Sequence, residues 1–234
     1  MKKIAIFSDI HGNLQALKSI IDDIDKENFD EGICLGDIIG VGPNPKECLD
    51  IIKDSKIKMV KGNHEIYQIN KEIRKRLSKS EDEHRNWINS LLTEEELDYI
   101  KNIPMYYEEL IDGYLFNFSH FFLNEEKNYF ESLNILGTNR IYQIANEQES
   151  DYMFIGHSHD DFQIQNKSLV TCVGSSGCNL NNMTFYTVLE IDNGNVKIYK
   201  KELEYDRKSF EKEVKKAEYP DKSRLINIFF GIKE

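Results

Sequence analysis

Short apolar runs alternate with amphipathic stretches along the first sixty residues. Residues 3–8, 32–35 and 58–60 are apolar runs of the length typical of buried strands. Between them, residues 14–26 carry apolar side chains at helical spacing, and residues 44–54 open with an Asn-Pro pair that is typical of a helix start. This strand–helix–strand–helix–strand order predicts a sheet that is at least partly parallel.

The pattern changes after residue 65. Residues 66–103 are mostly polar with apolar positions at helical spacing, which predicts a helical excursion that ends before Pro104. Strand-like runs follow at residues 105–110, 114–118, 152–155, 162–164, 169–173, 184–191 and 196–203. A charged helix is predicted over residues 207–217. Because no repeat, linker or low-complexity tract interrupts the sequence, we expect residues 1–234 to form a single domain with one helical excursion.

Composition narrows the class of protein. The chain has 234 residues, a formal net charge of −11 and no apolar run near the roughly 20 residues that span a bilayer. Its apolar opening is too short for a signal peptide, so we expect a cytoplasmic protein without a membrane partner. An acidic surface repels nucleic acid, and the simplest interpretation of the basic run over residues 71–79 is a solvated helix face.

The cysteines point to packing rather than chemistry. No two of them form a Cys-x-x-Cys pair, so we expect buried thiols and neither a disulfide framework nor a structural zinc site. They are Cys34, Cys48, Cys172 and Cys178.

Side chains that commonly bind metals follow five of the predicted strands. Five of the six histidines stand there, together with two aspartates and one asparagine. The segments are Ser8-Asp9-Ile10-His11, Gly36-Asp37, Gly62-Asn63-His64-Glu65, Ser119-His120 and Gly156-His157-Ser158-His159. Since the carboxyl ends of neighbouring strands in an α/β sheet meet at one crevice, the pattern predicts one site and not five.

Seven of these side chains form the candidate metal-ligand set. They are Asp9, His11, Asp37, Asn63, His120, His157 and His159. In Asp-x-His and His-x-His, two side chains lie on the same side of an extended backbone and can face one cavity. Seven ligands exceed what one ion usually takes from a protein, but they suit two ions if a carboxylate bridges them. Asp37 is the best bridge, because it stands alone in its segment.

His64 is predicted to act on the substrate. Asn63 and His64 are neighbours, and on an extended chain they point apart, so they are not expected to bind the same ion. His64 is therefore the candidate catalytic residue, a cation or proton donor near the leaving oxygen, with Glu65 orienting its ring. His84 lies within the polar excursion, where solvent is its expected environment and no role is assigned.

The ordered segments resemble the motifs of the calcineurin-like metallophosphoesterase superfamily. Those motifs are Asp-x-His, Gly-Asp, Gly-Asn-His-Asp/Glu, His and Gly-His-x-His, and all five are present. The stretch Gly40-Val41-Gly42-Pro43-Asn44-Pro45 is further similar to the bacterial YfcE-type phosphodiesterases. The resemblance implies an α/β fold, a four-layer α-β-β-α sandwich of two mixed sheets flanked by helices.

The resemblance also implies a division of the ligands between two metals. Asp9, His11, Asp37 and His159 would hold one ion, and Asp37, Asn63, His120 and His157 would hold the other. His64 would be the catalytic histidine.

Two departures from the family pattern bear on the substrate. Asp37 is followed by Ile38-Ile39-Gly40, so a phosphate-binding arginine of the Ser/Thr phosphoprotein phosphatases is missing and that branch is not favoured. Phe121 follows His120 where the subgroup commonly has glycine, and Phe121 and Phe122 are expected to narrow the pocket.

The expected function is hydrolysis of a small phosphorylated substrate, a phosphodiester in preference to a phosphomonoester, by a hydroxide that bridges two divalent metals. Manganese is the expected metal, although iron, zinc and nickel also suit mixed histidine and carboxylate ligands. The alternatives are a phosphomonoesterase or protein phosphatase of the same fold, a nuclease or nucleotide-signal hydrolase, and a non-catalytic binding scaffold. The complete ligand set argues against the scaffold, and the sequence leaves the oligomeric state open.

Overall fold

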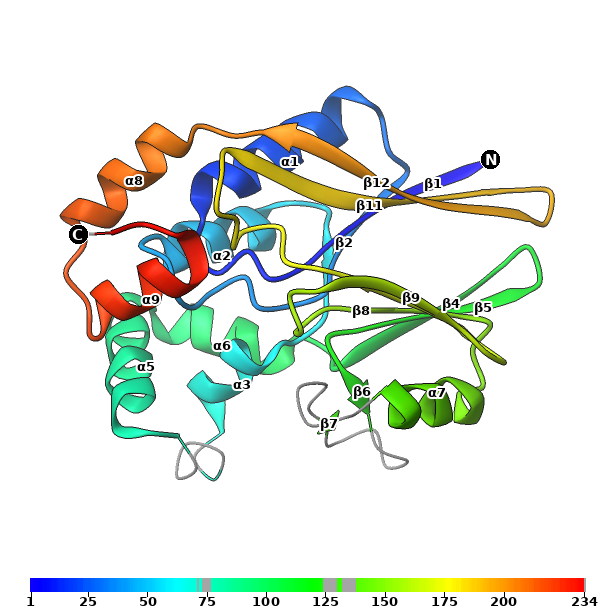
Figure 1. Cartoon of the computed structure of the whole chain (residues 1–234), viewed down its shortest axis with the longest axis horizontal. Coiled ribbons are helices and arrows are strands. Elements are labelled where there is room, and N and C mark those ends of the chain that lie inside the picture. The colour runs from blue at the N-terminus through cyan, green and yellow to red at the C-terminus, as the bar shows by residue number, and fades with distance from the viewer. Residues whose placement is uncertain (71, 73–76, 124–129, 132–137, 234) are drawn as a thin grey trace.

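Two five-stranded mixed sheets lie face to face in the computed structural model of the chain, with helices on their outer sides (Figure 1). The structure describes residues 1–70, 72, 77–123, 130–131 and 138–233. The predicted four-layer sandwich is therefore confirmed.

The first sheet has the strand order β12-β11-β1-β2-β3. Its strands are β1 (Lys2–Phe7), β2 (Glu31–Cys34), β3 (Lys58–Met59), β11 (Met183–Asp192) and β12 (Asn195–Glu204). The strands β1, β2 and β3 are parallel, whereas β11 runs antiparallel to β1 with Ile4 opposite Leu189. The parallel strands end at the same edge, as the alternation of apolar runs and helices predicts.

The second sheet has the order β4-β5-β8-β10-β9. Its strands are β4 (Tyr106–Ile111), β5 (Tyr114–Ser119), β8 (Tyr152–Ile155), β9 (Asp161–Gln165) and β10 (Leu169–Val173). The central strands β5, β8 and β10 are parallel, and the two edge strands are antiparallel to their neighbours. A separate pair, β6 (Phe122–Leu123) and β7 (Phe130–Glu131), completes the strands of the described residues.

Eight helices lie within the described residues. They are α1 (Leu14–Lys26), α2 (Pro45–Asp54), α3 (Asn63–Ile69), α5 (Lys79–Leu91), α6 (Glu94–Asn102), α7 (Thr138–Glu147), α8 (Arg207–Lys216) and α9 (Lys222–Phe230). The Asn13 side chain caps α1 by accepting from the Ala16 amide, and Ser78 and Thr93 open α5 and α6 with capping boxes. Asn44 precedes α2, but its side chain makes no capping hydrogen bond.

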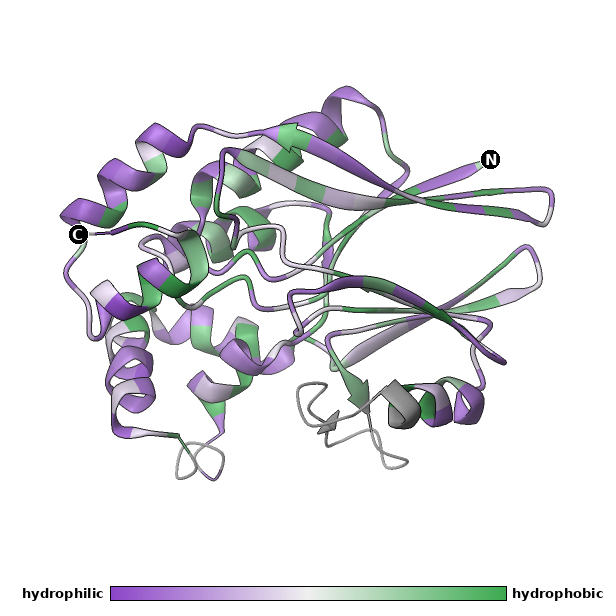
Figure 2. Ribbon diagram, in the orientation of Figure 1, coloured by the Kyte–Doolittle hydropathy of each residue, from purple (hydrophilic) through white to green (hydrophobic). Residues whose placement is uncertain are grey.

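The period of two along β1 places its side chains in two different cores. Ile4 and Ile6 pack between the sheets with Phe116 and Phe154, whereas Ala5 and its neighbours of the same parity pack against α1 and α2. On the other side, α7 packs on the outer face of the second sheet. Figure 2 shows the same division, with hydrophobic residues along the strands and polar residues on the outer helix surfaces.

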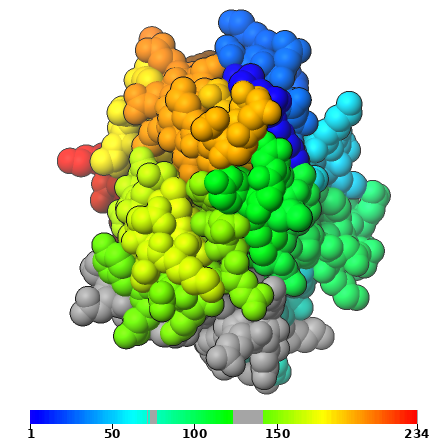
Figure 3. All heavy atoms as spheres, turned by 90° about the vertical axis from the view of Figure 1, so that its right-hand side faces the viewer, coloured from blue at the N-terminus to red at the C-terminus, as the bar shows by residue number. Residues whose placement is uncertain are grey.

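The ends of the two sheets meet at the face opposite the carboxyl ends of β1 and β2. Figure 3 views this face, where the β11–β12 hairpin lies against the β4–β5 hairpin. The Gly194 amide there donates to an Asp112 carboxylate oxygen at 3.3 Å.

Most predicted elements are confirmed, with boundaries that differ by one or two residues. In the described part of the helical excursion the structure has the separate helices α3, α5 and α6, and α7, α9, β6 and β7 were not predicted. Of the basic run over 71–79, residues 71 and 73–76 lie outside the described residues. Every helix within the described part of the chain is too short or too polar to traverse a lipid bilayer.

Candidate metal centre

The seven predicted metal ligands come together at the carboxyl ends of the parallel strands. The loops after β1 and β2 carry Asp9, His11 and Asp37, and the first turn of α3, just after β3, carries Asn63. From the second sheet, His120 follows β5, and His157 and His159 follow β8. Ligands from both sheets therefore reach one site, as the sequence predicts.

Five of the seven residues adopt a left-handed backbone conformation. Their φ angles are 55° at Asp9, 50° at His11, 52° at Asp37, 69° at His157 and 62° at His159. The interpretation of the Asp-x-His and His-x-His pairs as extended is therefore wrong, because β1 and β8 end before them and tight turns aim the side chains instead. Non-glycine residues in this region carry backbone strain that typically marks functional sites.

Asp37 lies between the two halves of the site. Its Oδ2 is 3.3 Å from His120 Nε2 and 3.8 Å from His11 Nε2. The same His120 Nε2 atom is 3.3 Å from Asn63 Oδ1, while the other ring nitrogen, Nδ1, faces the Leu35 carbonyl oxygen at 2.7 Å. This second contact fixes the ring, so that Nε2 is the nitrogen presented to the site.

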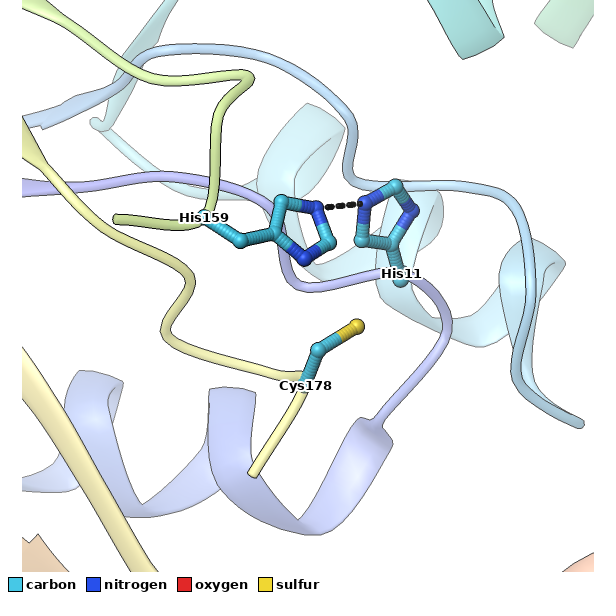
Figure 4. Close-up of side chains that lie close together, drawn as sticks. All are labelled: His11, His159 and Cys178. Carbon is cyan, nitrogen blue, oxygen red and sulfur yellow. Dashed lines mark hydrogen bonds between the residues drawn. The ribbon is translucent and has the colours of Figure 1, made fainter. Parts of the chain in front are cut away.

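The Asp9 carboxylate lies close to His11, His157 and His159. Its Oδ1 is 3.3 Å from His159 Nε2 and 3.6 Å from His11 Nε2, and these two nitrogens are 3.0 Å apart (Figure 4). The backbone amide of His157 donates to Asp9 Oδ2 at 3.0 Å. Carboxylate oxygens and imidazole nitrogens thus converge from four separate positions along the chain.

The donors fit a pair of divalent cations. One group that can hold an ion contains His11, Asp37 and His64, a second contains Asp37, His120 and His157, and Asp37 is common to both. Asp9 Oδ1 is buried and accepts no well-directed hydrogen bond although imidazole nitrogens surround it. A buried carboxylate oxygen that faces imidazole nitrogens without a hydrogen bond is the arrangement expected where cations complete the site.

Burial and the neighbouring charges shift the pKa values of the acids and histidines in this site. Burial would raise the pKa of Asp9, but His120, His11 and His159 hold it well below its usual range. Burial would lower the pKa of His120, but Asp37 and Asp9 raise it to about 9. Burial dominates at His157, whose pKa falls to about 4.

His64 lies beside the ligands on α3. Its amide donates to Asp37 Oδ1 at 2.8 Å, and its ring meets the His11 ring edge-on with the centroids 4.8 Å apart. Asn63 and His64 occupy a helix turn, so the extended-chain argument used to separate them is wrong. Burial lowers the pKa of His64 to about 3, although Asp37 opposes this shift, so the ring is neutral near neutral pH. This corrects the prediction that His64 acts as a cation.

Glu65 holds the backbone instead of orienting His64. Its carboxylate accepts from the amides of Asp37 at 2.8 Å, Ile38 at 3.0 Å, Ile39 at 3.3 Å and Gly62 at 2.8 Å. These bonds join the start of α3 to the loop that carries Asp37. Burial and the neighbouring Asp37 raise the pKa of Glu65 to about 7, while its amide donors favour the charged form.

Two glycines allow the loops to approach the acids. A Cβ atom on Gly62 would lie 2.2 Å from Asp37 Oδ1, and one on Gly156 would lie 2.1 Å from Ser8 Oγ and 2.7 Å from Asp9 Oδ2. Any side chain at these positions would displace a candidate ligand.

Sequence reasoning missed Cys178 and Phe229. The Cys178 thiol forms a third group of potential ligand atoms with His11 and His159, as Figure 4 shows. The Phe229 ring, on the unpredicted helix α9, lies 6.1 Å from the His11 ring and 5.7 Å from the His159 ring. The apolar pairs Leu225-Ile226 and Phe229-Phe230 at helical spacing were a signal for α9.

The remaining predictions near the site need correction. His84 is only 7% exposed, because the C-terminal segment covers α5 and brings Tyr219 against His84 and Trp87. Phe121 is fully buried with its ring against His120 and His157, and Phe122 belongs to the core beneath α7. Phe121 therefore packs against two of the proposed ligands, Phe122 belongs to the core, and neither ring is exposed to narrow a pocket.

Comparison with known proteins identifies the family. The model of the calcineurin-like phosphoesterases matches residues 2–161, which contain all eight predicted site residues. The chain belongs to the calcineurin-like phosphoesterase family. The chain spans less than two thirds of the length of the curated relatives that it matches.

One relative is similar to this chain in sequence, and two solved structures are similar to it in fold. The uncharacterized protein MJ0912 from Methanocaldococcus jannaschii is 33% identical over 159 residues, which are 68% of this chain and 63% of that protein. The hypothetical protein PH1004 from Pyrococcus horikoshii has a TM-score of 0.78 at 20% identity, with all of both chains covered. A metallophosphoesterase from Sphaerobacter thermophilus has a TM-score of 0.69 at 21% identity over 95% of this chain and 98% of that one. At these identities the two structures show a shared fold.

Proposed function

We propose that this chain is a two-metal phosphoesterase that hydrolyses small phosphodiesters in preference to phosphomonoesters. The observation that carries the proposal is the position of Asp37, whose Oδ2 lies 3.3 Å from His120 Nε2 and 3.8 Å from His11 Nε2, so that one carboxylate faces ligands of both proposed ions. The proposed metal ligands are Asp9, His11, Asp37, Asn63, His120, His157 and His159. His64 is the proposed catalytic residue.

The donors divide around Asp37. Asp9, His11 and His159 lie within 3.0–3.6 Å of one another on one side, and His120 and Asn63 lie on the other. When bound, two divalent cations supply a nucleophile from water at neutral pH and offset the negative charge of the phosphoryl group. We propose that both ions are Mn²⁺, because a mixture of histidine and carboxylate ligands suits this metal.

His64 is placed to assist the leaving oxygen. Its backbone is anchored to Asp37 through the 2.8 Å amide bond, and its side chain lines a cavity next to the metal centre. A neutral imidazole donates one N–H, so it can hydrogen-bond the ester oxygen as the phosphorus–oxygen bond breaks. Loss of one such hydrogen-bond donor to a developing negative charge typically lowers kcat by about 10²–10³-fold.

The surroundings of Asp37 support the preference for diesters. A monoester carries a second negative charge, which a basic side chain near the phosphate would offset. Ile38 and Ile39, which follow Asp37, are fully buried. Lys61, which precedes Gly62, donates its ammonium to the Lys101 carbonyl oxygen at 2.9 Å. None of these three side chains offers a positive charge to the phosphate, which favours a substrate with one negative charge.

The test uses metal-stripped protein to which Mn²⁺ is added back. We expect turnover of bis(4-nitrophenyl) phosphate at a higher kcat/KM than 4-nitrophenyl phosphate, and loss of turnover on Asp37→Asn. Asp50→Asn, on the surface of α2, is the matched control and should keep the activity of the unaltered protein. Absence of activity on every phosphoester with Mn²⁺, Fe²⁺, Zn²⁺ and Ni²⁺ would overturn the proposal, and a preference for the monoester would overturn the diester part alone.

A further inference from the structure

A cavity of about 190 Å³ opens beside the metal centre, between α3, α5 and α9. We call it the side pocket. Asn63 and His64 form its inner wall, so whatever fills it lies next to the proposed leaving oxygen. Neither the metal ligands nor the role of His64 accounts for its presence.

The walls of the side pocket are mostly apolar and partly aromatic. Tyr67, Ile88, Leu225 and Phe229 line it. The Tyr67 ring lies 5.6 Å from the His64 ring, and Phe229 reaches the histidines of the metal centre. Aromatic and aliphatic walls of this kind bind a flat apolar group by burying its surface.

Charge in the side pocket is already balanced. Arg85 pairs with Asp82 at 3.2 Å, and Arg224 donates to Asp221 at 2.5 Å. An additional phosphate or carboxylate on the ligand would compete with these aspartates. The ligand group that suits the pocket is therefore uncharged.

Three polar atoms of residues that line the side pocket lack a hydrogen-bond partner, namely Gln68 Oε1 and the two ring nitrogens of His84. Gln68 is only 8% exposed, and its Oε1 is buried with no hydrogen bond, while its amide nitrogen donates weakly to the His64 carbonyl oxygen at 3.4 Å. A buried acceptor without a partner costs free energy, which a donor on a ligand would recover. Because Oε1 is closed off from solvent, a rotation of the Gln68 side chain is needed to turn it toward the pocket, and the rotated side chain favours a ligand with an N–H or O–H group.

We propose that the side pocket binds the leaving alcohol of the phosphoester, and that this alcohol carries one uncharged ring system with a hydrogen-bond donor. The inference rests on the proposed function. In the reaction the bond between phosphorus and the ester oxygen breaks, the oxygen of a water molecule bonds to phosphorus, and one proton of that water ends on the leaving oxygen. The ring then leaves as a neutral phenol or nucleoside.

The test compares two esters that differ in one group, methyl 4-aminophenyl phosphate and methyl 4-methylphenyl phosphate. Their rings have the same shape, but only the first can donate to Gln68. We expect the amino ester to have a KM about 10-fold lower, which corresponds to one hydrogen bond of about 1.4 kcal/mol. Gln68→Leu should remove this difference, and Gln68→Glu, which keeps an acceptor, should retain it.

A second pair of variants tests the cavity itself. Leu225→Trp fills the side pocket and should raise KM for both esters at least 10-fold. Ile228→Trp places the same ring on α9 at a position that is 55% exposed and outside the pocket, and it should leave KM unchanged. Equal KM values for the two esters, together with no effect of Leu225→Trp, would overturn the proposal while the phosphoesterase activity stands.

Binding without turnover separates the two proposals. Saturation-transfer NMR should detect 4-aminophenol and uridine on the unaltered protein, and neither on Leu225→Trp. If only one binds, that result decides between a phenol and a nucleoside as the source of the ring. If no ester is hydrolysed but both alcohols bind, the phosphoesterase proposal fails alone. If neither alcohol binds, the pocket proposal fails whatever the activity.

Discussion

Replacing Glu65 with glutamine should disrupt the metal centre without touching any proposed ligand. The two carboxylate oxygens each accept two backbone amides, Oε2 those of Asp37 and Gly62 and Oε1 those of Ile38 and Ile39. Glutamine has a single acceptor oxygen, and its NH₂ group must face two of these donors. The weaker pair, at 3.0 and 3.3 Å, is the pair it will lose.

The size of the effect follows from the count of lost bonds. Each buried amide left without an acceptor costs about 1–3 kcal/mol, so two cost roughly 4 kcal/mol of the free energy of unfolding. At about 2–4 °C per kcal/mol for a chain of this size, the Tm should fall by roughly 8–16 °C. Because these amides hold the Asp37 loop against α3, we also expect weaker Mn²⁺ binding.

The assay is differential scanning calorimetry of the apoprotein, followed by Mn²⁺ titration. Glu94→Gln is the matched control, because Glu94 is exposed in the first turn of α6, and its Tm should stay within about 2 °C of the unaltered protein. If Glu65→Gln melted together with this control and bound Mn²⁺ equally well, the assignment of the carboxylate as the support of the loop would be wrong.

Four further changes test other parts of the account. His64→Ala should lower kcat by about 10²–10³-fold and keep two Mn²⁺ per chain by plasma mass spectrometry, and loss of an ion would mean that His64 is a ligand. Gly62→Ala should fold but lose Mn²⁺, because its Cβ would lie 2.2 Å from Asp37 Oδ1, and unchanged binding in the same titration would contradict this. Chelation should lower the Tm, with recovery on addition of Mn²⁺, since metal bound at 1,000 times its Kd stabilises by about 4 kcal/mol; a Tm that ignores Mn²⁺ would argue against a structured site. Burial lowers the pKa of His84 to about 4, so the folded chain binds fewer protons than the unfolded chain between that value and about 6.5, and stability is lost as the pH falls through this window. In urea titrations His84→Phe should therefore lose about 1–2 kcal/mol less than the unaltered protein between pH 7 and pH 5, and equal losses would refute the assignment.

The sequence predicted the convergence of ligands within each sheet because that convergence depends on strand order. Apolar runs such as β8 and β10 are buried on both faces, so their bounds can be predicted from the sequence to the residue. Residues that follow neighbouring parallel strands must meet at one edge, which places Asp9 beside Asp37. His157 follows β8 of the second sheet, and its position beside these two aspartates depends on how the two sheets stack.

The pattern of apolar and polar residues could not predict the backbone conformation at these same residues. Period-two reasoning assumes an extended chain, and nothing in the letters of Asp-x-His shows that both residues take a left-handed conformation. Glu65 contacts amides 26 to 28 positions earlier in the chain, so its role depends on tertiary packing. His84 is polar within a polar helix, and only the distant Tyr219 segment buries it.

The central claim is that Asp37 joins two ions in one centre. Electron paramagnetic resonance of the protein loaded with Mn²⁺, with the metal content measured on the same sample, tests it most directly. The account predicts two ions per chain with the spectrum of an exchange-coupled pair, and uncoupled Mn²⁺ signals after Asp37→Asn. A single ion per chain, or two ions without coupling in the unaltered protein, would contradict it.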